Sequence, residues 1–276
     1  FKSEVISADS RQFYKELKIG TARPDENELK GIPHHFLAYT SVENEINAGH
    51  FEREAEKKIN NLFEKHDFLF VVGGSGFYID ALLFGIVVIP PIDPKIREQA
   101  KKEFTDNGLA YIQSRLKETD PELYDTIDIQ NPKRIIRGLE VFYQSGQKLS
   151  SFQKGNKKAK WPYLRIGLEW DREELYERIN QRVDLMVEAG LVQEVNSLLE
   201  YRELNALKTV GYTELFRYFS KELSMTSAID LVKQNSRRYA KRQLTWLRNQ
   251  TDTQWFAYDE IDKMLSFISE KQPLKK

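Results

Sequence analysis

The sequence contains no cysteine among its 276 residues, which excludes disulfide bonds and thiolate metal sites. No apolar run approaches the roughly 20 residues of a membrane-spanning helix, and no signal-peptide pattern stands at the start. The net charge is zero, since 42 basic residues balance 42 acidic ones. We therefore expect a cytoplasmic protein with no membrane partner, in which any site for a polyanion depends on local clusters of charge.

Two motifs are absent as well. The phosphate-binding loop GxxxxGK(S/T) occurs nowhere in the sequence. The four histidines include no HxxxH pair, so we predict no zinc site from cysteine or histidine. Residue 1 is Phe rather than Met, and the first strand pattern follows almost at once. We expect from this that the sequence is truncated at its N-terminus.

Strand and helix patterns alternate over the first ninety residues. EVISA is a short apolar strand, and residues 49–66 have the apolar spacing of an amphipathic helix. FLFVV, residues 68–72, is a continuous apolar run of the kind that is buried on both faces of a parallel sheet. It leads into GGSGFYIDALL, a glycine turn that opens a helix. This order predicts an α/β fold with a parallel sheet.

The pattern changes after IPPIDP, residues 89–94, where three polar helices follow without a convincing strand. In the last of them, Asn131 and Pro132 form a helix start with an N-cap followed by proline. A strand returns at YLRIGLEW, and only helices are expected after Asp171. We predict an α/β core, 1–92 and 155–276, interrupted by a helical insertion, 93–154. The sequence has no long exposed apolar helix that would suggest an obligate dimer, so we expect a monomer.

The glycine turn itself has two interpretations. After a buried strand, Gly73, Gly74 and Gly76 allow backbone N–H groups to approach an anion at the positive end of the next helix, and Ser75 adds a hydroxyl. Alternatively, the turn needs glycine only for its dihedral angles. The sequence leaves both open.

Asp9 also follows the carboxyl end of a strand, which is where open α/β sheets bind ligands. A catalytic carboxylate is one interpretation of this position. The other is an N-cap, because Asp9 or Ser10 can cap a short helix that runs to Phe13.

Basic residues gather on later helices. Arg178 and Arg182 lie one turn apart beside an apolar stripe of Leu175, Ile179, Val183 and Met186, where they can clamp a diphosphate or face solvent. Residues 231–250 hold six Lys and Arg side chains, among them Lys241 and Arg242, and no acidic one. Their charge favours contact with a polyanion over a solvated face. In the insertion, Arg134 and Arg137 share one helix face.

Several motifs occur in an order that resembles one family: ISADSRQFY, IGTARP, PHHF, VVGGSGFY, PPIDP, NPKRIIRGLEV, RINQRVDLM, TVGY and RRYAKRQLTWLR. They resemble bacterial tRNA dimethylallyltransferases, the isopentenyl-diphosphate:tRNA transferase family, over residues 4 to about 256. The resemblance implies transfer of a dimethylallyl group from dimethylallyl diphosphate to N6 of adenosine 37, beside the anticodon. It also implies a P-loop-kinase-like sheet core with a helical insertion that binds the anticodon stem-loop.

The resemblance further implies roles for single residues. Asp9 matches the general base, with a possible contact to Mg²⁺, the expected cofactor. Ser75 stands where the family usually has threonine, and Arg182, or Arg178, matches the arginine on the diphosphate. The positions that match tRNA-binding segments are Ser10, Arg11, Gln12, Arg97, Lys133, Arg134, Arg137 and the run Lys208, Thr209, Val210, Gly211, Tyr212 and Thr213. Lys241 and Arg242 are predicted to bind tRNA phosphates, and Gln12 to read the edge of the target base.

One departure concerns the family's P-loop, which lies upstream of the aspartate motif and is not in this sequence. We expect that the natural protein has this loop and that a chain without it is inactive. Three alternatives remain: an enzyme that prenylates free AMP, ADP or ATP, a small-molecule kinase, and a catalytically inactive RNA-binding relative. The basic helix of the insertion argues against the first, and the retention of Asp9 and Ser75 against the last.

Overall fold

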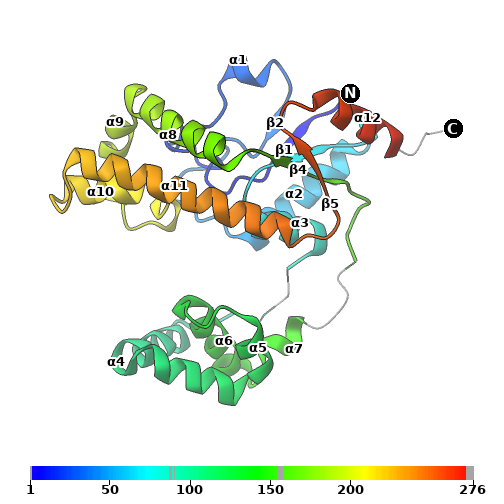
Figure 1. Ribbon diagram of the computed structural model, residues 1–276. Coiled ribbons are helices and arrows are strands. Elements are labelled where there is room, and N and C mark those ends of the chain that lie inside the picture. Colours follow the sequence, from blue (N-terminus) through cyan, green and yellow to red (C-terminus); the bar gives the residue numbers. More distant parts are fainter. Residues whose placement is uncertain (1, 87–88, 90, 154–157, 272–276) are drawn as a thin grey trace. The chain divides into compact units, whose positions relative to one another are not determined.

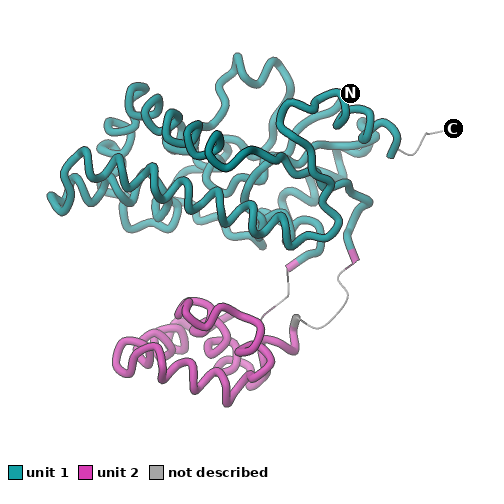
Figure 2. The backbone as a smooth tube through the Cα atoms, viewed as in Figure 1, with its two compact units in different colours: residues 1–85, 159–276 teal, residues 86–158 magenta. Residues whose placement is uncertain are grey.

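The computed structural model describes residues 2–86, 89, 91–153 and 158–271 of the chain (Figure 1). The chain divides into two compact units, residues 1–85 with 159–276, and residues 86–158 (Figure 2). We call these unit 1 and unit 2. The predicted insertion, 93–154, lies within unit 2, and its predicted end falls on 154–157, outside the described residues.

Unit 1 contains two small sheets and most of the helices. Its elements are β1 (Val5–Ser7), α1 (Glu26–Leu29), β2 (His34–His35), α2 (Ala48–Leu62), β3 (Phe70–Val72), α3 (Gly76–Phe84), β4 (Arg165–Glu169), α8 (Arg172–Glu188), α9 (Leu191–Asn196), η1 (Leu199–Tyr201), η2 (Asn205–Leu207), α10 (Tyr212–Phe219), α11 (Met225–Arg248), β5 (Thr253–Ala257) and α12 (Ile261–Lys271). The predicted α/β class is confirmed, because unit 1 combines many helices with small parallel sheets.

The first sheet has the order β2-β1-β3, and both pairs of strands are parallel. Ser7 at the end of β1 pairs with Val72 at the end of β3. Because parallel strands place their carboxyl ends at one edge, the segment after β1 and the glycine turn after β3 become neighbours. This register therefore brings together two motifs that lie about 65 residues apart in the sequence.

Burial of β3 differs from the prediction of a strand covered on both faces. Val71 and Val72 are 38% and 57% exposed. β3 stands at the end of the strand order, and among the described residues no strand pairs with its outer edge. A continuous apolar run gives the strand but does not reveal its place in the sheet.

The second sheet corrects the prediction that only helices follow Asp171. Residues Thr253–Ala257 form β5, which pairs with β4 in parallel over all five positions, Arg165↔Thr253 to Glu169↔Ala257. TQWFA is rich in residues that favour strands. The strand was not predicted because this segment is short and follows a long helix.

An aromatic cluster lies at the centre of the core of unit 1. Phe13, which is fully buried, stacks on Phe51 of α2 with ring centroids 5.1 Å apart and contacts Tyr39 and Tyr78 edge-on. Such pairs contribute about 0.5–1.5 kcal/mol each beyond their buried area. The cluster fixes the turn after β1 against α2 and α3.

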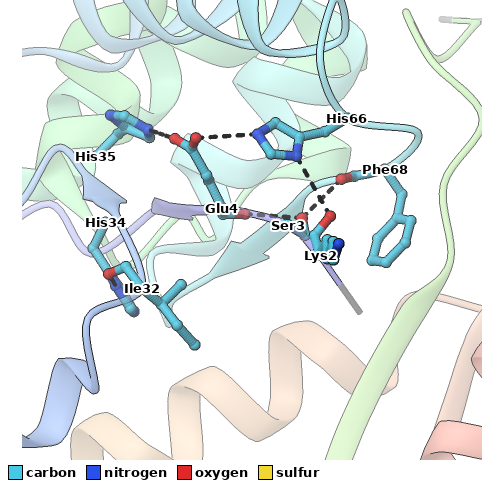
Figure 3. Close-up of polar contacts among 8 residues, drawn as sticks. All are labelled: Lys2, Ser3, Glu4, Ile32, His34, His35, His66 and Phe68. Carbon is cyan, nitrogen blue, oxygen red and sulfur yellow. Dashed lines mark hydrogen bonds and ion pairs between the residues drawn. The ribbon is translucent and has the colours of Figure 1, made fainter.

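A polar cluster ties together the segments at the amino ends of the first sheet (Figure 3). Glu4 lies between two imidazoles, with Oε2 2.6 Å from Nε2 of His35 and Oε1 3.1 Å from Nε2 of His66. Ser3 donates to the carbonyl oxygen of Phe68 at 2.7 Å. These contacts join β1 to β2 and to the segment after α2.

Unit 2 consists of α4 (Pro94–Thr119), α5 (Pro121–Thr126), α6 (Pro132–Ser145) and α7 (Leu149–Gln153). α4 contains a kink at Gly108, where φ is 79°, so the two helices predicted on either side of this residue are confirmed. The predicted start of α6 is confirmed too, because the Asn131 side chain accepts a hydrogen bond from the N–H of Lys133. A separate apolar core includes Ile112, Leu116, Leu123, Ile135 and Leu139.

Candidate active site

A cavity of about 830 Å³ lies at the carboxyl edge of the first sheet, within unit 1. Many predicted site residues border it: Asp9, Ser10, Arg11, Gly74, Ser75, Gly76, Arg182, Lys208, Thr209, Val210, Gly211, Thr213 and Arg242. They come from five separate parts of the sequence. The fold therefore gathers the motifs of the first sheet with helices α8 and α11 and the loop before α10.

The segment after Asp9 is a turn rather than the predicted short helix to Phe13, and the catalytic interpretation of Asp9 stays a prediction. Oδ1 of Asp9 accepts hydrogen bonds from the N–H of Arg11 at 2.8 Å and of Gln12 at 3.4 Å, as a capping residue does. The same side chain borders the large cavity and a second one of about 240 Å³, which Gln12 and Gly73 also border. The hydrogen bonds to Oδ1 therefore hold the carboxylate in place, and Asp9 borders both cavities.

The glycine turn is shaped by close approach. A Cβ on Gly73 would lie 2.4 Å from the carbonyl carbon of Ala8, and one on Gly74 would lie 1.7 Å from Nε2 of Gln243. On Gly76 it would meet the Trp246 ring at 2.3 Å. None of these three glycines has a positive φ, so the interpretation that the turn needs glycine for its dihedral angles is wrong. The turn needs glycine because β1 and α11 pack directly against it.

Ser75 joins the two loops of the site. Its Oγ accepts a hydrogen bond from the N–H of Ser10 at 3.0 Å and donates to Oγ of Ser10 at 3.1 Å. Ser75 is the N-cap of α3 but makes no side-chain capping bond there. Its hydroxyl is therefore used across the site rather than for its own helix.

Electrostatic coupling extends to Arg182 and Tyr239. Partial burial lowers the pKa of Arg182, while the Asp9 carboxylate acts in the opposite direction. Burial raises the pKa of Tyr239, as does the charge of Asp9, and the hydrogen bond of Tyr239 to Ser75 lowers it. Both side chains border the cavity, so a cation and a phenol lie within the field of Asp9.

Arg178 does not border this cavity, although it lies one turn before Arg182. Its guanidinium stacks over the Trp170 ring at 4.3 Å from the centroid, and Trp170 in turn stacks on Tyr258 at 3.5 Å. Between the two arginines, the geometry favours Arg182 for an anion in the cavity.

The apolar side of the cavity comes from α8 and α11. Ile179, Val183 and Met186 border it, whereas the sequence suggested a buried stripe; of these three only Val183 is buried, at 3% exposure. Trp246 on α11 faces the same space and donates to Oδ2 of Asp80 at 3.1 Å. The wall is thus apolar, opposite the polar groups of the two loops.

Arg11 and Gln12 make internal hydrogen bonds. Nη1 of Arg11 donates to the carbonyl oxygens of Asn205 and Ala206 at 2.9 and 3.1 Å. Nε2 of Gln12 donates to the carbonyl oxygens of Thr21 and Ala22 at 3.1 and 3.3 Å. These bonds hold neighbouring loops in place, and the prediction that Gln12 reads a base edge stays a prediction.

Tyr212 is the one member of the 208–213 run with a fully buried side chain. Its hydroxyl donates to Oε1 of Glu194 at 2.6 Å, and Glu194 also accepts from the N–H groups of Ile19 and Gly20. Burial and the charge of Glu194 raise the pKa of Tyr212. Its side chain therefore fixes the loop at residues 18–21, two of which border the cavity, and does not reach solvent.

Some cations of the basic helix α11 contact α8, and others lie at or beside the cavity. Lys233 forms an ion pair with Asp184 of α8 at 2.6 Å, and Arg237 donates to Asn180. The carboxylate that the sequence window lacked is thus supplied by another helix. Arg242 borders the cavity and stacks on Tyr239 at 5.5 Å, whereas Lys241 is exposed beside it.

Sequence reasoning missed Gln243. Its Nε2 donates to the carbonyl oxygen of Gly74 at 3.1 Å. A signal existed, because Tyr239, Gln243 and Trp246 follow helical spacing on one face of α11. The basic side chains of this helix drew the prediction, and the amide on its aromatic face was overlooked.

The remaining predicted residues lie in unit 2. Lys133 and Arg134 are exposed in the first turn of α6. Arg97 of α4 and Arg137 of α6 both contact Glu140, which is 6% exposed. Their predicted contact with tRNA stays a prediction.

In the described ranges, no group of three or more His, Asp or Glu side chains is arranged to hold a metal ion. No helix there is long and apolar enough to cross a membrane. Asp9 and Glu214 are carboxylates that border the cavity, and the oxygens of Glu214 already accept from the N–H of Gly211 and from Nδ2 of Asn235. A divalent cation in the cavity would therefore contact Asp9 together with oxygen atoms of a bound ligand.

The comparisons with known proteins agree with the resemblance of the motifs. The model of the family described as IPP transferase matches residues 12–250. The chain is 46% identical to the tRNA dimethylallyltransferase of Cytophaga hutchinsonii over 98% of its length and 90% of that protein. It is 41% identical to tRNA dimethylallyltransferase 1 of Bacteroides thetaiotaomicron over 97% and 87% of the two chains.

Solved structures give the same result. The full-length tRNA isopentenylpyrophosphate transferase of Bacillus halodurans matches with a TM-score of 0.72 and 33% identity over 98% of this chain and 88% of that one. A eukaryotic dimethylallyltransferase acting on tRNA matches with a TM-score of 0.80 and 26% identity over 100% and 75%. With the motifs, the fold and the cavity in agreement, the chain belongs to the IPP transferase family.

Proposed function

We propose that this protein is a prenyltransferase that modifies tRNA, moving a dimethylallyl group from dimethylallyl diphosphate to N6 of adenosine 37 in the anticodon stem-loop. Family membership and relatives named tRNA dimethylallyltransferase support transfer to tRNA. The observation that carries the assignment of the site is that Asp9, Ser75 and Arg182 border one cavity with an apolar wall and a basic rim.

Asp9 is suited to the role of general base. The adenine amine is a weak nucleophile because its lone pair is delocalised into the ring. When N6 bonds to the first carbon of the dimethylallyl group, the carbon–oxygen bond to the diphosphate breaks and N6 gains positive charge. A proton then passes from N6 to the Asp9 carboxylate, an assistance worth roughly 10²–10⁴-fold in rate.

The leaving diphosphate takes the electron pair and becomes more negative. Ser75 supplies a hydroxyl and Arg182 a guanidinium where this charge develops. α3 begins at Gly76, which borders the cavity beside Ser75, and the amino end of a helix favours an anion. Ser75 is held by Ser10, so its position is fixed before the substrate arrives.

Mg²⁺ fits the donor set of this site if the protein supplies only part of its ligands. It prefers hard oxygen ligands and usually takes one or two carboxylates together with substrate phosphates, and Asp9 is a carboxylate of this kind beside serine hydroxyls. When bound, it would neutralise negative charge on the diphosphate. Asp9 would hold it, with the remaining ligands from diphosphate oxygens.

The apolar wall is suited to the five-carbon dimethylallyl group. Ile179, Val183 and Met186 offer a surface without hydrogen-bonding groups, and burying a small hydrocarbon against such a surface is favourable by about 25 cal/mol per Å². This wall also limits water near the allylic carbon, which would otherwise compete with adenine as the acceptor.

Unit 2 favours tRNA over a free nucleotide as the acceptor. It is a compact helical unit with its own core and exposed basic side chains on α6. A free adenine nucleotide needs only the cavity of unit 1. We therefore do not favour AMP, ADP or ATP as acceptor, and we propose that the enzyme acts as a monomer in the cytoplasm, where tRNA is modified.

The test uses the protein expressed from its full gene, with Mg²⁺ and dimethylallyl diphosphate. An anticodon stem-loop with adenosines at positions 36, 37 and 38 competes with AMP in one reaction, and both are weighed by mass spectrometry. We expect a dimethylallyl mass gain on the RNA alone. Gain on AMP alone would assign the protein to the nucleotide prenyltransferases, and gain on neither with RNA bound would leave an RNA-binding protein.

A further inference from the structure

Unit 2 contains a buried carboxylate between two cations. Oε2 of Glu140 on α6 lies 3.0 Å from Nη1 of Arg137, and Oε1 lies 3.8 Å from Nε of Arg97 on α4. The Glu140 side chain is 8% exposed, whereas those of Arg97 and Arg137 are 52% and 42% exposed. Each oxygen of the carboxylate thus faces a different guanidinium: Arg137 donates a hydrogen bond, and Arg97 lies at ion-pair distance.

The charges of this cluster leave a positive surface. Burying a carboxylate is costly unless cations pair with it, and here two arginines surround one glutamate. A guanidinium has five N–H donors in a rigid plane. The contacts with Glu140 use one nitrogen of each arginine, so most donors stay available at the surface for a second anion.

The backbone around the cluster is held by another contact one helical turn away. The N–H of Asp93, the N-cap of α4, donates to Oε1 of Gln144 at 2.8 Å. Asp93 and Arg97 are four residues apart on α4, and Gln144 and Glu140 are four apart on α6. The first turn of α4 is therefore fixed against α6 at both levels, which limits the freedom of Arg97.

We propose that Glu140 is a positioning residue that holds Arg97 and Arg137 as a preformed pair for one phosphate group of an RNA backbone. This inference rests on the proposed function, in which tRNA is the substrate. Holding two long side chains in place before binding removes part of the entropy that they would otherwise lose. Two planar guanidiniums at a fixed separation also match the oxygens of a phosphate better than point charges do.

Glu140→Gln separates this role from simple electrostatics because the two predict opposite signs. Removal of a negative charge from an RNA-binding surface strengthens binding if only charge matters. If Glu140 positions the arginines, the loss of its charge frees them, and affinity for the stem-loop falls roughly three- to tenfold. The slope of the logarithm of affinity against the logarithm of salt concentration should become shallower by about 1, the value for one phosphate contact.

Glu98→Gln is the matched control. Glu98 is an exposed carboxylate on α4 next to Arg97, so this change removes the same charge without touching the arginine pair. We expect RNA affinity in Glu98→Gln to stay equal or rise slightly. Thermal unfolding followed by circular dichroism checks that each variant is folded.

A double-mutant cycle adds a measurement that a purely structural contact would not move. In the wild type, Arg97→Ala weakens RNA binding; in the Glu140→Gln background, the same change costs less, because Arg97 is already misplaced. If Glu140→Gln does not fold, Arg97→Lys and Arg137→Lys replace it. They keep the charge but lose the planar guanidinium, and we expect weaker binding from each.

Wild-type protein is measured first, both for RNA binding and for prenyl transfer to the stem-loop. Wild-type transfer together with unchanged or tighter binding in Glu140→Gln, or in the lysine variants, would overturn the positioning role alone. Absence of RNA binding in the wild type would instead remove the proposed function and this inference with it.

Discussion

The side-chain amide of Gln243 donates a hydrogen bond to the carbonyl oxygen of Gly74, 169 residues away in the sequence, and occupies the space that a Cβ on Gly74 would need. One side chain of α11 thus fixes the peptide before Ser75. The same helix carries Arg242 on the cavity rim. Any movement of α11 on binding RNA would therefore reach the glycine turn directly.

Gly73→Ala and Gly74→Ala should differ in their effect on stability. A methyl group on Gly73 meets the backbone of Ala8 at 2.4 Å, which cannot move aside without disturbing β1. On Gly74 it meets only the end of the flexible Gln243 side chain. We expect Gly73→Ala to lower the free energy of unfolding by about 1–3 kcal/mol and Gly74→Ala by about 1 kcal/mol, the value of a lost hydrogen bond.

Chemical denaturation of both variants checks this order. Gln243→Ala combined with Gly74→Ala should lose little more than Gly74→Ala alone, because both changes break the same contact. Equal destabilisation by the two glycine variants would mean that β1 does not constrain the turn.

Arg182→Gln and Arg178→Gln test which arginine serves the diphosphate. Arg182 borders the cavity within the field of Asp9, so its loss should lower kcat/KM for dimethylallyl diphosphate by roughly 10²–10³-fold. Arg178 stacks on Trp170, and its loss should change stability by only about 0.5–1 kcal/mol. Steady-state kinetics at saturating RNA distinguish the two, and a larger loss from Arg178→Gln would reverse the assignment.

Much of this site follows from the order of motifs along the sequence. Asp9 and Ser75 each come just after a strand, and neighbouring parallel strands bring such positions together. The choice between Arg178 and Arg182 did not follow, because a helix turn separates them and only the tertiary structure shows which one reaches the cavity. The burial of Tyr212 did not follow from the sequence either. Its partner Glu194 lies on another helix, and nothing local marks the tyrosine as buried.

Other features depend on packing that a single segment does not contain. The ion pair of Lys233 with Asp184 and the close approach of Trp246 to Gly76 join residues far apart in sequence. The short strand β5 was missed because pairing with β4, rather than a long pattern, determines it. Local patterns predicted the class of fold, whereas contacts between distant segments set the details.

Charge reversal on α11 should depend on position. Arg242→Glu places a carboxylate on the cavity rim, so we expect weaker binding of the stem-loop and a flatter dependence on salt. Lys241→Glu, at an exposed neighbouring position, should have the smaller effect. Lys233→Glu serves as the control, because it breaks the ion pair with Asp184 and should act on stability first.

Filter binding or fluorescence anisotropy over a salt series measures these effects. Unchanged RNA binding in Arg242→Glu would show that the basic side chains of α11 face solvent and do not contact RNA.

Stability should depend on pH through Glu4, which lies between His35 and His66 (Figure 3). The hydrogen bond from His35 holds the pKa of Glu4 below its ordinary value of 4.5. The unfolded chain then binds more protons than the folded one in that range, so this contribution is present above pH 4.5 and is lost as pH falls through the lowered pKa.

Glu4→Gln removes this dependence. The free energy of unfolding, measured by denaturant titration at several pH values from neutral to acidic, should fall less with acidification in the variant than in the wild type. Parallel curves for the two proteins would exclude Glu4 as a source of the acid sensitivity.

The most direct test of the account is single-turnover prenyl transfer by Asp9→Asn, with RNA binding measured on the same protein. Asparagine keeps the Oδ1 atom that accepts from the N–H groups of Arg11 and Gln12, so the turn should survive while the base is lost. We predict a rate roughly 10²–10⁴-fold lower with unchanged affinity for the stem-loop. A near-normal rate would contradict the assignment of Asp9 as the general base.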